Sequence, residues 1–560
     1  MPPGKKHTSG GLKLRPAPKG RPVRSEPLDQ VRRLLGERPR RADLLIEHLH
    51  VLQDALGHLP VTHLNALAAE LGLAPAEVYE VATFYHHFDI VDDGETPPPA
   101  LTVRVCESIA CHMAGAEALH AELAGREADG VRVLRAPCVG RCEQAPVAVV
   151  GTNPIDRASA AKVDAAVKAE AVAPELPGVV AYEEYRAGGG YEVLRACVAG
   201  ERSREEVIET VLASGLKGLG GAGFPTGKKW QFVRAEAAPR LMALNADEGE
   251  PGTFKDRFCM ETDPHRMLEG VLIAAWVIEA EEVFFYLRDE YAAARAILTR
   301  ELDALYADPP CALPPFQLRR GAGAYICGEE TSLIESIEGK RGEPRLRPPF
   351  PAQVGIFGRP TLVQNVETVF WLREILEDGA AAFAARGKEG HPGVRYFSVS
   401  GRVKEPGVYL APNGVTAREL VEMAGGMAEG HTLYGYLPGG ASGGILPARL
   451  AELPLDFGVL AEHGCFIGSA AVVILSERDS AKDAAHNLMH FFAHESCGKC
   501  TPCRAGTEKA TTLMAEGTWR LPLLDDLSAT MVDASICGLG QAAPNAYECV
   551  KRFFPQELEA

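Results

Sequence analysis

Eight of the fourteen cysteines in this chain fall into two groups of four, and this grouping constrains the fold more than any other feature. In the later group, Cys497, Cys500 and Cys503 are separated by two residues each, and Cys537 follows further along. Three cysteines at this spacing can each bind one iron of a cubic 4Fe-4S cluster, with a distant fourth for the last corner, whereas tetrahedral zinc sites rarely use such a run. The last part of the chain is therefore expected to fold around an iron-sulfur cluster.

The earlier group consists of two pairs of cysteines. Cys106 and Cys111 enclose four residues, and Cys138 and Cys142 enclose three. Each pair begins just after a predicted strand, so the four thiolates can converge at one edge of a small α/β layer. Structural zinc also accepts four cysteines at such spacings, so the spacing alone leaves zinc and a 2Fe-2S cluster open. The other six cysteines are scattered, and buried, unreactive thiols are expected for them: Cys197, Cys259, Cys311, Cys327, Cys465 and Cys549.

Length and composition place the chain among ordinary globular proteins. Its 560 residues correspond to three or four domains, with 46% hydrophobic and 24% charged residues. The longest apolar stretch, 271–278, is too short for a membrane span, and the basic start of the chain lacks the apolar core of a secretion signal. We therefore expect a cytoplasmic protein with no membrane partner. The net charge of −17, despite seven Lys/Arg and no acid in residues 1–24, disfavours generic nucleic-acid binding.

Changes in hydrophobic periodicity divide the chain into segments. Residues 1–24 are rich in Gly, Pro and basic residues and are predicted to form a flexible arm. Apolar residues then recur at helical spacing up to Phe84, and strand-like runs begin at Leu101. The expected domains are a helical bundle with a small α/β layer over 25–175, an α/β domain over 190–385, a small β-grasp domain over 390–478 and a helical domain over 480–560.

A glycine-rich segment in the α/β domain matches a known nucleotide-binding pattern in the wrong context. Gly218, Gly220 and Gly223 satisfy the dinucleotide fingerprint, but the preceding residues 207–213 have helical character, whereas that fingerprint follows a strand. A P-loop is also excluded, because Lys229 stands where its Ser or Thr should be. An ordinary turn or a loop that lets a ligand approach the backbone closely remains.

Two further segments of this domain combine small and polar residues. The segment 245–253 follows the apolar strand 241–244, so its amide and carboxylates gather at the carboxyl end of a strand, where α/β proteins bind ligands. The segment 321–331 is a turn of small residues that leads into a helix and can bind an anion or the edge of a flavin. Together the three segments favour a ligand site.

These segments carry a resemblance to a known family. Residues 190–555 resemble the NADH-binding flavoprotein subunit of respiratory complex I and its soluble relatives, through 218–230, 245–257, 321–331, 348–351, 364–368 and the Cys497 group. Residues 28–165 are similar to the thioredoxin-fold 2Fe-2S subunit that partners it. The resemblance implies a multidomain α/β fold: a helical bundle plus a thioredoxin-like ferredoxin domain, an α/β FMN/NAD-binding domain, a β-grasp domain of the SLBB type, and a helical bundle with an Fe-S cluster.

The resemblance also implies cofactors and site residues. FMN, NAD(H), one 4Fe-4S cluster and one 2Fe-2S cluster are expected, so that a hydride exchanged between nicotinamide and flavin is passed on as single electrons. Glu250 and Glu330 are the implied catalytic residues. The implied cofactor-binding residues are Gly218, Gly220, Gly221, Gly223, Phe224, Lys229, Phe232, Asn245, Asp247, Glu248, Tyr325, Gly328, Glu329, Arg347, Phe350, Gln364, Asn365 and Thr368. The implied cluster ligands are Cys106, Cys111, Cys138 and Cys142 for 2Fe-2S, and Cys497, Cys500, Cys503 and Cys537 for 4Fe-4S.

The fusion of the 2Fe-2S part and the flavoprotein part in one chain indicates which kind of partner subunit to expect. In complex I the parts are typically separate, and the fused form resembles most the diaphorase subunit of NAD-dependent formate dehydrogenases that use molybdenum or tungsten. This implies a hetero-oligomer in which a large, cluster-rich partner subunit carries Mo or W and the formate site. The alternatives are the diaphorase subunit of an NAD-reducing hydrogenase, the NADH-input module of complex I and a nonenzymatic scaffold with structural zinc. The histidines His86 and His87 lie outside all these sites and are expected at the surface or in packing.

Overall fold

A computed structural model describes residues 23–125 and 130–559 of the chain. The chain divides into two compact units, Met1–Pro98 and Pro99–Ala560. Most of the predicted basic arm, residues 1–22, lies outside the described residues. The domain boundaries drawn from the sequence therefore stay predictions, and each unit is described by itself.

The first unit is helical, as the periodicity of its apolar residues predicts. Its helices bury one apolar stripe each, and Leu35, Leu49, Leu67 and Val78 are completely buried where α1 and α4 pack on α3 and α2 packs between them. Pro75 occupies the first position of α4, where its missing N–H costs nothing. The elements are α1 Ser25–Leu35, α2 Leu45–Leu56, β1 Leu59–Pro60, α3 Val61–Leu71, α4 Pro75–Phe84 and β2 Ile90–Val91, with β1 and β2 paired in parallel.

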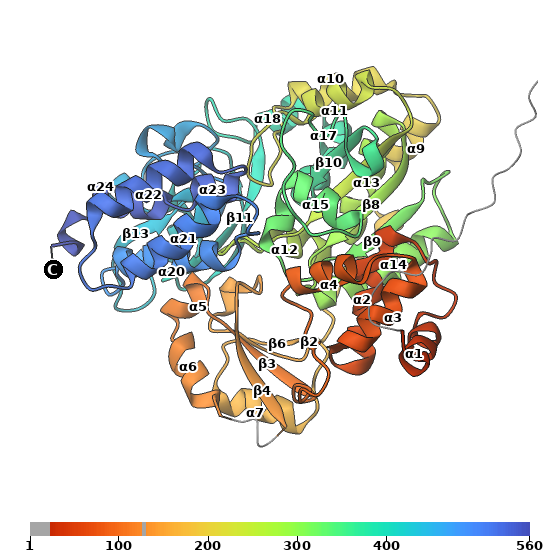
Figure 1. Ribbon diagram of the computed structural model, residues 1–560. Coiled ribbons are helices and arrows are strands. Elements are labelled where there is room, and N and C mark those ends of the chain that lie inside the picture. The colour runs from red at the N-terminus through yellow and green to blue at the C-terminus, as the bar shows by residue number, and fades with distance from the viewer. Residues whose placement is uncertain (1–22, 126–129, 560) are drawn as a thin grey trace, which may run out of the picture. The chain divides into compact units, whose positions relative to one another are not determined.

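The second unit begins with the predicted small α/β layer, shown in orange in Figure 1. Its sheet has the order β4-β3-β5-β6, in which only β3 and β4 run parallel. The strands predicted before the two cysteine pairs are confirmed. The elements are β3 Leu101–Cys106, α5 Ile109–Met113, α6 Ala116–Leu123, β4 Val131–Ala136, η3 Cys142–Gln144, β5 Ala148–Val150, β6 Asn153–Ile155 and α7 Ala160–Lys168.

A four-stranded parallel sheet of order β10-β7-β8-β9 forms the centre of the next domain. Helix α13 is buried on nearly every side because it contacts the sheet and also the helices α9, α16 and α17, which explains its long apolar run. The strand expected at 241–244 is confirmed. The strands are β7 Arg240–Ala246, β8 Ala280–Leu287, β9 Phe316–Arg320 and β10 Thr361–Asn365. The helices are α8 Tyr182–Ala187, α9 Glu192–Val198, α10 Arg204–Ala213, α11 Thr226–Ala235, α12 Lys255–Thr262, α13 Pro264–Ile278, α14 Ala292–Ala307, η4 Tyr325–Gly328, α15 Glu330–Ile337, α16 Val366–Phe370, α17 Leu372–Asp378 and α18 Ala380–Ala384.

The predicted β-grasp domain is a mixed five-stranded sheet of order β12-β11-β15-β13-β14 with one α-helix, α19. Thr416 and Glu419 cap this helix reciprocally, which fixes where it begins. The elements are β11 Val394–Gly401, β12 Gly407–Pro412, α19 Ala417–Met423, β13 Leu433–Leu437, β14 Leu446–Pro447 and β15 Ala471–Ser476.

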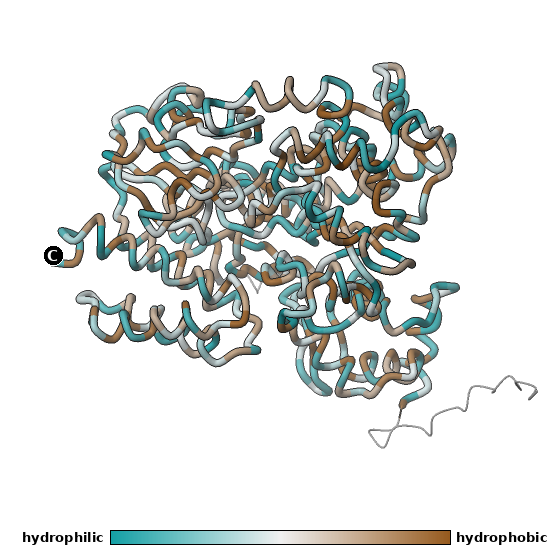
Figure 2. Tube along the Cα trace, turned by 90° about the horizontal axis from the view of Figure 1, so that it is seen from above, coloured by the Kyte–Doolittle hydropathy of each residue, from teal (hydrophilic) through white to brown (hydrophobic). Residues whose placement is uncertain are grey.

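The chain closes with a layer of helices, drawn in blue in Figure 1, in which α21 packs between α20 and α22. These helices are α20 Ala481–His494, α21 Thr501–Met514, α22 Leu521–Ala534, α23 Gly538–Ala542 and α24 Asn545–Phe553. In the part of the chain that the structure describes, no helix is long and apolar enough to cross a membrane. Figure 2 agrees, since hydrophobic and hydrophilic stretches are interleaved along the trace.

Candidate functional site

The candidate site lies where the parallel strands β7 and β10 end side by side. Asn245 and Asn365 are register partners at the end of this strand pair. The Asn245 side chain donates a hydrogen bond of 2.8 Å to the carbonyl of Gly328 and accepts one of 3.0 Å from the amide of Asp247. Three segments far apart in the sequence are thereby joined at one sheet edge, as the sequence predicts.

The glycine-rich loop is held against this edge from the other side. The amide of Leu219 donates to the Thr368 hydroxyl at 2.8 Å, and a Cβ atom on Gly220 would lie 3.1 Å from the Asn365 side chain. Gly223 has a φ of +66°, and a Cβ atom there would lie 2.5 Å from the Phe457 ring. The loop follows helix α10, so the rejection of a Rossmann turn is confirmed. The backbone therefore leaves no room for a side chain at Gly223 and little room for one at Gly220.

Near the ends of β7 and β10, two buried polar atoms have no hydrogen-bond partner among the described residues: Oδ2 of Asp247 and Nε2 of Gln364. Buried polar atoms are normally paired, so this acceptor and this donor indicate a polar ligand between the two strand ends. Burial also raises the pKa of Asp247 well above its usual value. A cradle of backbone lined by glycines, together with one hydrogen-bond acceptor and one donor, suits a flavin, because the flavin ring system carries both kinds of group. The residues present therefore fit FMN.

The Glu248 carboxylate accepts hydrogen bonds from other parts of the protein. Its carboxylate accepts from the amides of Asp256 at 2.8 Å and Arg257 at 3.0 Å, and from the Tyr291 hydroxyl at 2.8 Å. Burial raises the pKa of Glu248 to about 7. These bonds cap helix α12 and fix the loop that carries Asp247 and Glu250, so the Glu248 carboxylate supports the site through contacts within the protein.

Glu250 links three parts of the unit. One carboxylate oxygen accepts from the amide of Ser442 at 2.7 Å and from the Ser442 hydroxyl, and the other accepts from the Tyr325 hydroxyl. The amide of Tyr325 in turn donates to Glu495 at 2.8 Å. Burial raises the pKa of Glu250 above its usual value. Sequence reasoning missed Ser442 and Glu495, which come from the β-grasp and the helical domain and share no motif with the flavin loop.

A second set of charges and rings lies next to the glycine-rich loop. Glu330 pairs with Lys229 at 3.0 Å and with Arg347 at 3.3 Å, and Arg347 also reaches Glu329 at 3.3 Å. Glu329 caps helix α15 by accepting from two of its first amides. Large aromatic rings are exposed nearby, with Phe224 at 45%, Phe232 at 49% and Phe350 at 52%. Phe224 and Phe232 lie with their centroids 6.2 Å apart. Exposed rings beside paired charges suit the stacking of a nucleotide base.

The later cysteine group lines a small cavity. All four predicted ligands, Cys497, Cys500, Cys503 and Cys537, contribute to its wall, together with Ile326 from η4. Burial raises the pKa of Cys503 to about 11 and that of Cys537 to about 12. Four thiols gathered around one cavity, two of them costly to ionise without a cation, fit a 4Fe-4S cluster.

The earlier cysteine group is brought together as predicted. Cys106 lies within hydrogen-bonding reach of Cys111 and Cys138, and the sulfurs of Cys138 and Cys142 are 3.4 Å apart. All four side chains are buried. The arrangement fits a metal bound by four thiolates, with Cys106 at the end of β3, Cys111 in α5, Cys138 after β4 and Cys142 at the start of η3.

The side chain of Arg288 joins this cysteine site to the flavin-side loop. It donates to the carbonyl of Cys138 at 2.6 Å and to the carbonyl of Glu248. Phe254 packs against Cys138 and Cys142 in the same small buried cluster. Arg288 and Phe254 are further residues that the sequence did not single out, because neither belongs to a cysteine spacing or a glycine loop.

Four family models match parts of the chain. Residues 211–374 match the Nuo51 FMN-binding domain, 31–170 the thioredoxin-like 2Fe-2S ferredoxin, 396–446 the SLBB domain, and 483–560 the NADH-ubiquinone oxidoreductase-F iron-sulfur binding region. The multidomain α/β fold is thereby confirmed.

Curated relatives and a solved structure extend these matches. The chain is 41% identical over 392 residues to the F 2 subunit of the NADH-quinone oxidoreductase of Rhizobium meliloti, which covers 67% of this chain and 93% of that protein. It is 40% identical over 400 residues to the F subunit of the Aquifex aeolicus enzyme, covering 68% and 92%. A chain in the crystal structure of an NAD⁺-reducing NiFe-hydrogenase in the H₂-reduced state superposes with a TM-score of 0.81, with 34% identity and 93% of each chain covered.

The fold and the site thus define an NADH-oxidising flavin and iron-sulfur module. Because it matches these relatives over nearly their whole length, the chain belongs to the family of the F subunit of NADH-quinone oxidoreductase. The matching domains confirm the expected cofactors, which are FMN, a 2Fe-2S cluster and a 4Fe-4S cluster, with NADH as the substrate. The zinc alternative for the earlier cysteine group is disfavoured by its match to a 2Fe-2S ferredoxin.

Proposed function

We propose that this chain is the diaphorase subunit of an NAD-dependent formate dehydrogenase, in which electrons pass between partner clusters, the 4Fe-4S cluster, FMN and NAD. The observation that carries the diaphorase role is the position of η4. Its Tyr325 bonds to Glu250 at the loop beside the flavin cradle, and its next residue, Ile326, lines the cluster cavity. One turn of chain therefore contacts both redox sites, which suits transfer of electrons between them.

The site residues take separate roles in this proposal. The glycine-rich loop, Asn245, Asp247, Gln364 and Asn365 would hold FMN, which supplies both hydride exchange and one-electron exchange when bound. Phe224, Phe232 and Phe350 would stack the nucleotide, while Lys229 and Arg347 position Glu330 beside it. Glu250 would orient the nicotinamide, with its carboxylate fixed by Ser442 and Tyr325.

The proposed partner subunit is inferred from the domains that are fused in this chain. The fusion of a 2Fe-2S ferredoxin domain with the flavin module supports an NAD-coupled enzyme outside complex I, since the two NADH-quinone oxidoreductase relatives cover only 67–68% of this chain. Formate oxidation at Mo or W on a large, cluster-rich partner is the first candidate. A cytoplasmic location belongs to the same proposal, because both cysteine groups need reduced thiols.

A specific observation favours a second candidate, the diaphorase subunit of an NAD-reducing hydrogenase. The solved hydrogenase chain covers 93% of this chain, including both the ferredoxin and the flavin parts. Length and domain order therefore do not separate the two partners.

The isolated chain tests the diaphorase role, and the purified native complex tests the identity of the partner. The chain alone should oxidise NADH with ferricyanide but show no activity with formate or hydrogen, and a preparation without NADH:ferricyanide activity despite bound FMN would refute the diaphorase role. In the complex, Mo or W with formate-dependent NAD reduction supports the first candidate. Nickel with hydrogen-dependent reduction replaces it with the second, and quinone reduction with membrane subunits assigns the chain to complex I.

A further inference from the structure

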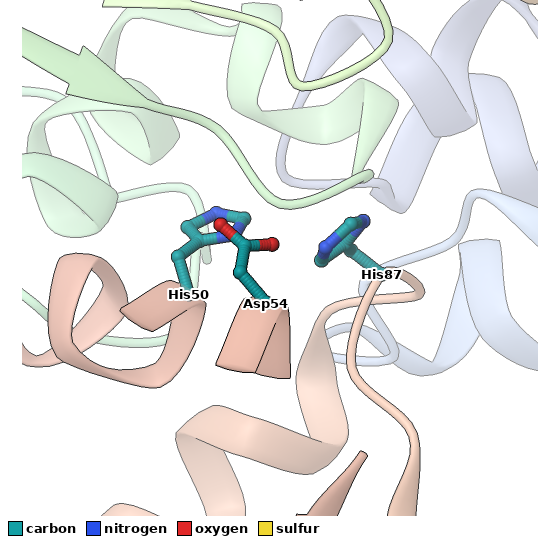
Figure 3. A group of neighbouring side chains, drawn as sticks. All are labelled: His50, Asp54 and His87. Atoms are coloured by element: carbon teal, nitrogen blue, oxygen red, sulfur yellow. The ribbon is translucent and has the colours of Figure 1, made fainter. Parts of the chain in front are cut away.

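Three side chains in the first unit form a cluster of metal-ligand type away from every cysteine group. His50 and Asp54 extend from helix α2, and His87 lies just after helix α4 (Figure 3). One potential ligand atom from each, a ring nitrogen or a carboxylate oxygen, lies within 4.8 Å of the other two. Neither the sequence motifs nor the proposed electron-transfer function uses these residues.

The backbone positions of the three residues are set by helix α2 and by hydrogen bonds that hold the turn after α4. His50 and Asp54 are four residues apart on one helix and therefore project from the same face. The turn that carries His87 is held against α2 by Gln53, whose side chain accepts from the amide of Asp89 at 3.2 Å. The amide of Leu59 also donates to the carbonyl of Asp89 at 2.7 Å, next to the β1–β2 pair.

The surroundings favour a site with one open side. His50 is buried and His87 half-buried, whereas Asp54 is exposed. The Phe88 ring packs against both histidines, with centroid distances of 4.9 Å to His50 and 5.6 Å to His87. An apolar wall behind two imidazoles, with a carboxylate at the solvent side, holds the ligand orientations and leaves a path for an ion.

The ligand set identifies the class of ion. Two imidazoles and one carboxylate suit a divalent transition-metal ion such as Zn²⁺ better than Mg²⁺ or Ca²⁺, which prefer oxygen ligands. Ligand atoms around tetrahedral zinc lie about 3.4 Å apart at bond lengths of about 2.0–2.1 Å. Rotation of the exposed Asp54 side chain and a small movement of His87 would bring the three atoms to that spacing.

We propose that His50, Asp54 and His87 bind a divalent transition-metal ion of the Zn²⁺ class, with water in the fourth position. The ion would join helix α2 to the turn after α4 and stabilise the helical unit by binding only its folded form. The site would give His87 a ligand role in place of the surface or packing role expected from the sequence. The inference does not depend on the proposed diaphorase function.

The test is Zn²⁺ binding by the full-length protein with both iron-sulfur clusters in place. Asp54→Asn and His87→Gln are the informative variants, because Asp54 is exposed and His87 lies outside the helices, so both should fold. His58→Gln is the matched control, since His58 is a half-buried histidine of the same unit outside the cluster. After removal of loosely bound ions, Zn²⁺ affinity is measured by competition with a chromophoric chelator, and zinc and iron per chain by mass spectrometry.

Each variant should weaken Zn²⁺ binding about 10- to 100-fold or more, with iron content and NADH:ferricyanide activity unchanged and with wild-type affinity in the control. Equal zinc affinity in wild type, Asp54→Asn and His87→Gln would overturn the proposal. So would a wild-type protein that retains no zinc at micromolar free Zn²⁺ while its iron content is complete. Because zinc can enter cysteine sites that have lost iron, only samples with full iron content are compared.

Discussion

Replacing Glu250 by glutamine is the most direct test of the nicotinamide side of the site. Glutamine has the same shape, its oxygen can still accept from Ser442, and its amide nitrogen can donate to the Tyr325 hydroxyl. The substitution therefore removes the negative charge while leaving the connections to the β-grasp domain and to η4 in place. FMN should remain bound, because the glycine-rich loop, Asn245 and Asn365 form a separate set of contacts.

The expected loss follows from the value of one charge-assisted hydrogen bond. Such a bond contributes about 1.5–3 kcal/mol, so kcat/KM for NADH should fall roughly 10- to 150-fold in Glu250→Gln. Glu281→Gln is a matched control, because Glu281 is an exposed carboxylate near the opposite end of strand β8 that pairs with Arg359. A surface pair of this kind contributes about 0–1 kcal/mol to stability, and NADH oxidation should not change.

The assay is NADH oxidation with ferricyanide at several NADH concentrations, together with FMN content from the visible spectrum. Wild-type kinetics in Glu250→Gln with full FMN content would refute the assigned role. Loss of FMN would show instead that Glu250 shapes the flavin cradle. Tyr325→Phe tests a third alternative, in which the Glu250 carboxylate acts only by holding Tyr325. In that case Tyr325→Phe should lose as much NADH oxidation activity as Glu250→Gln.

The pH dependence gives an independent check of the same residue. Burial raises the pKa of Glu250 in the folded protein above its value in the unfolded chain, so folding favours the protonated form. The charged form therefore costs stability at a pH above the raised pKa, and this cost decreases as the pH falls below that pKa and is gone below the pKa of the unfolded chain. Glu250→Gln should be as stable as the wild type at neutral pH, or more stable, and wild-type activity should fall toward that of the variant in acid.

The remaining predictions concern nucleotide stacking on Phe224, the 2Fe-2S site at Cys138 and the packing around Gly444. Phe224→Ala should raise KM for NADH more than it lowers kcat, because base stacking is felt equally in ground and transition states; an unchanged KM would contradict the stacking role. Cys138→Ser should abolish one 2Fe-2S signal in electron paramagnetic resonance and leave FMN bound, and stoichiometric zinc in the wild-type site would contradict the assignment. Gly444→Ala should lower the free energy of unfolding by about 1–3 kcal/mol, because Gly444 has a φ of +82° and an added Cβ would lie 2.7 Å from the Cys465 sulfur and 2.9 Å from that of Cys549. Thermal unfolding with equal FMN content measures this loss, and an unchanged melting temperature would show that the thiol pair can move aside.

Motifs with a fixed local spacing were predictable from the sequence. The run from Cys497 to Cys503 predicts a cluster site because its geometry is set over a few residues, and the same holds for the glycine-rich loop, whose helical flank at 207–213 already excludes a Rossmann turn. The segments 245–253 and 321–331 were expected to form one ligand site, and Asn245 is indeed bonded to Gly328.

Contacts between domains could not be predicted in this way. Ser442 binds Glu250 across 192 positions of sequence, and Glu495 binds the Tyr325 amide across 170.

Strand β10 was also missed, since its five residues carry no strand alternation and are defined by pairing with β7. The binding of a cofactor by Glu248 stays a prediction, and only the folded structure shows that its carboxylate also caps helix α12.

The arrangement of the second unit explains why one chain can serve hydride and single-electron chemistry. The loop 245–250 is bound through Glu250 to η4, which lines the 4Fe-4S cavity, and through the carbonyl of Glu248 to Arg288, which also binds Cys138 of the other cysteine group. Both connections are buried and hydrogen-bonded, so the distances from this loop to the two cysteine groups are fixed by packing. A two-electron site is useful to one-electron carriers only when such distances are short and constant, and here the same loop sets both.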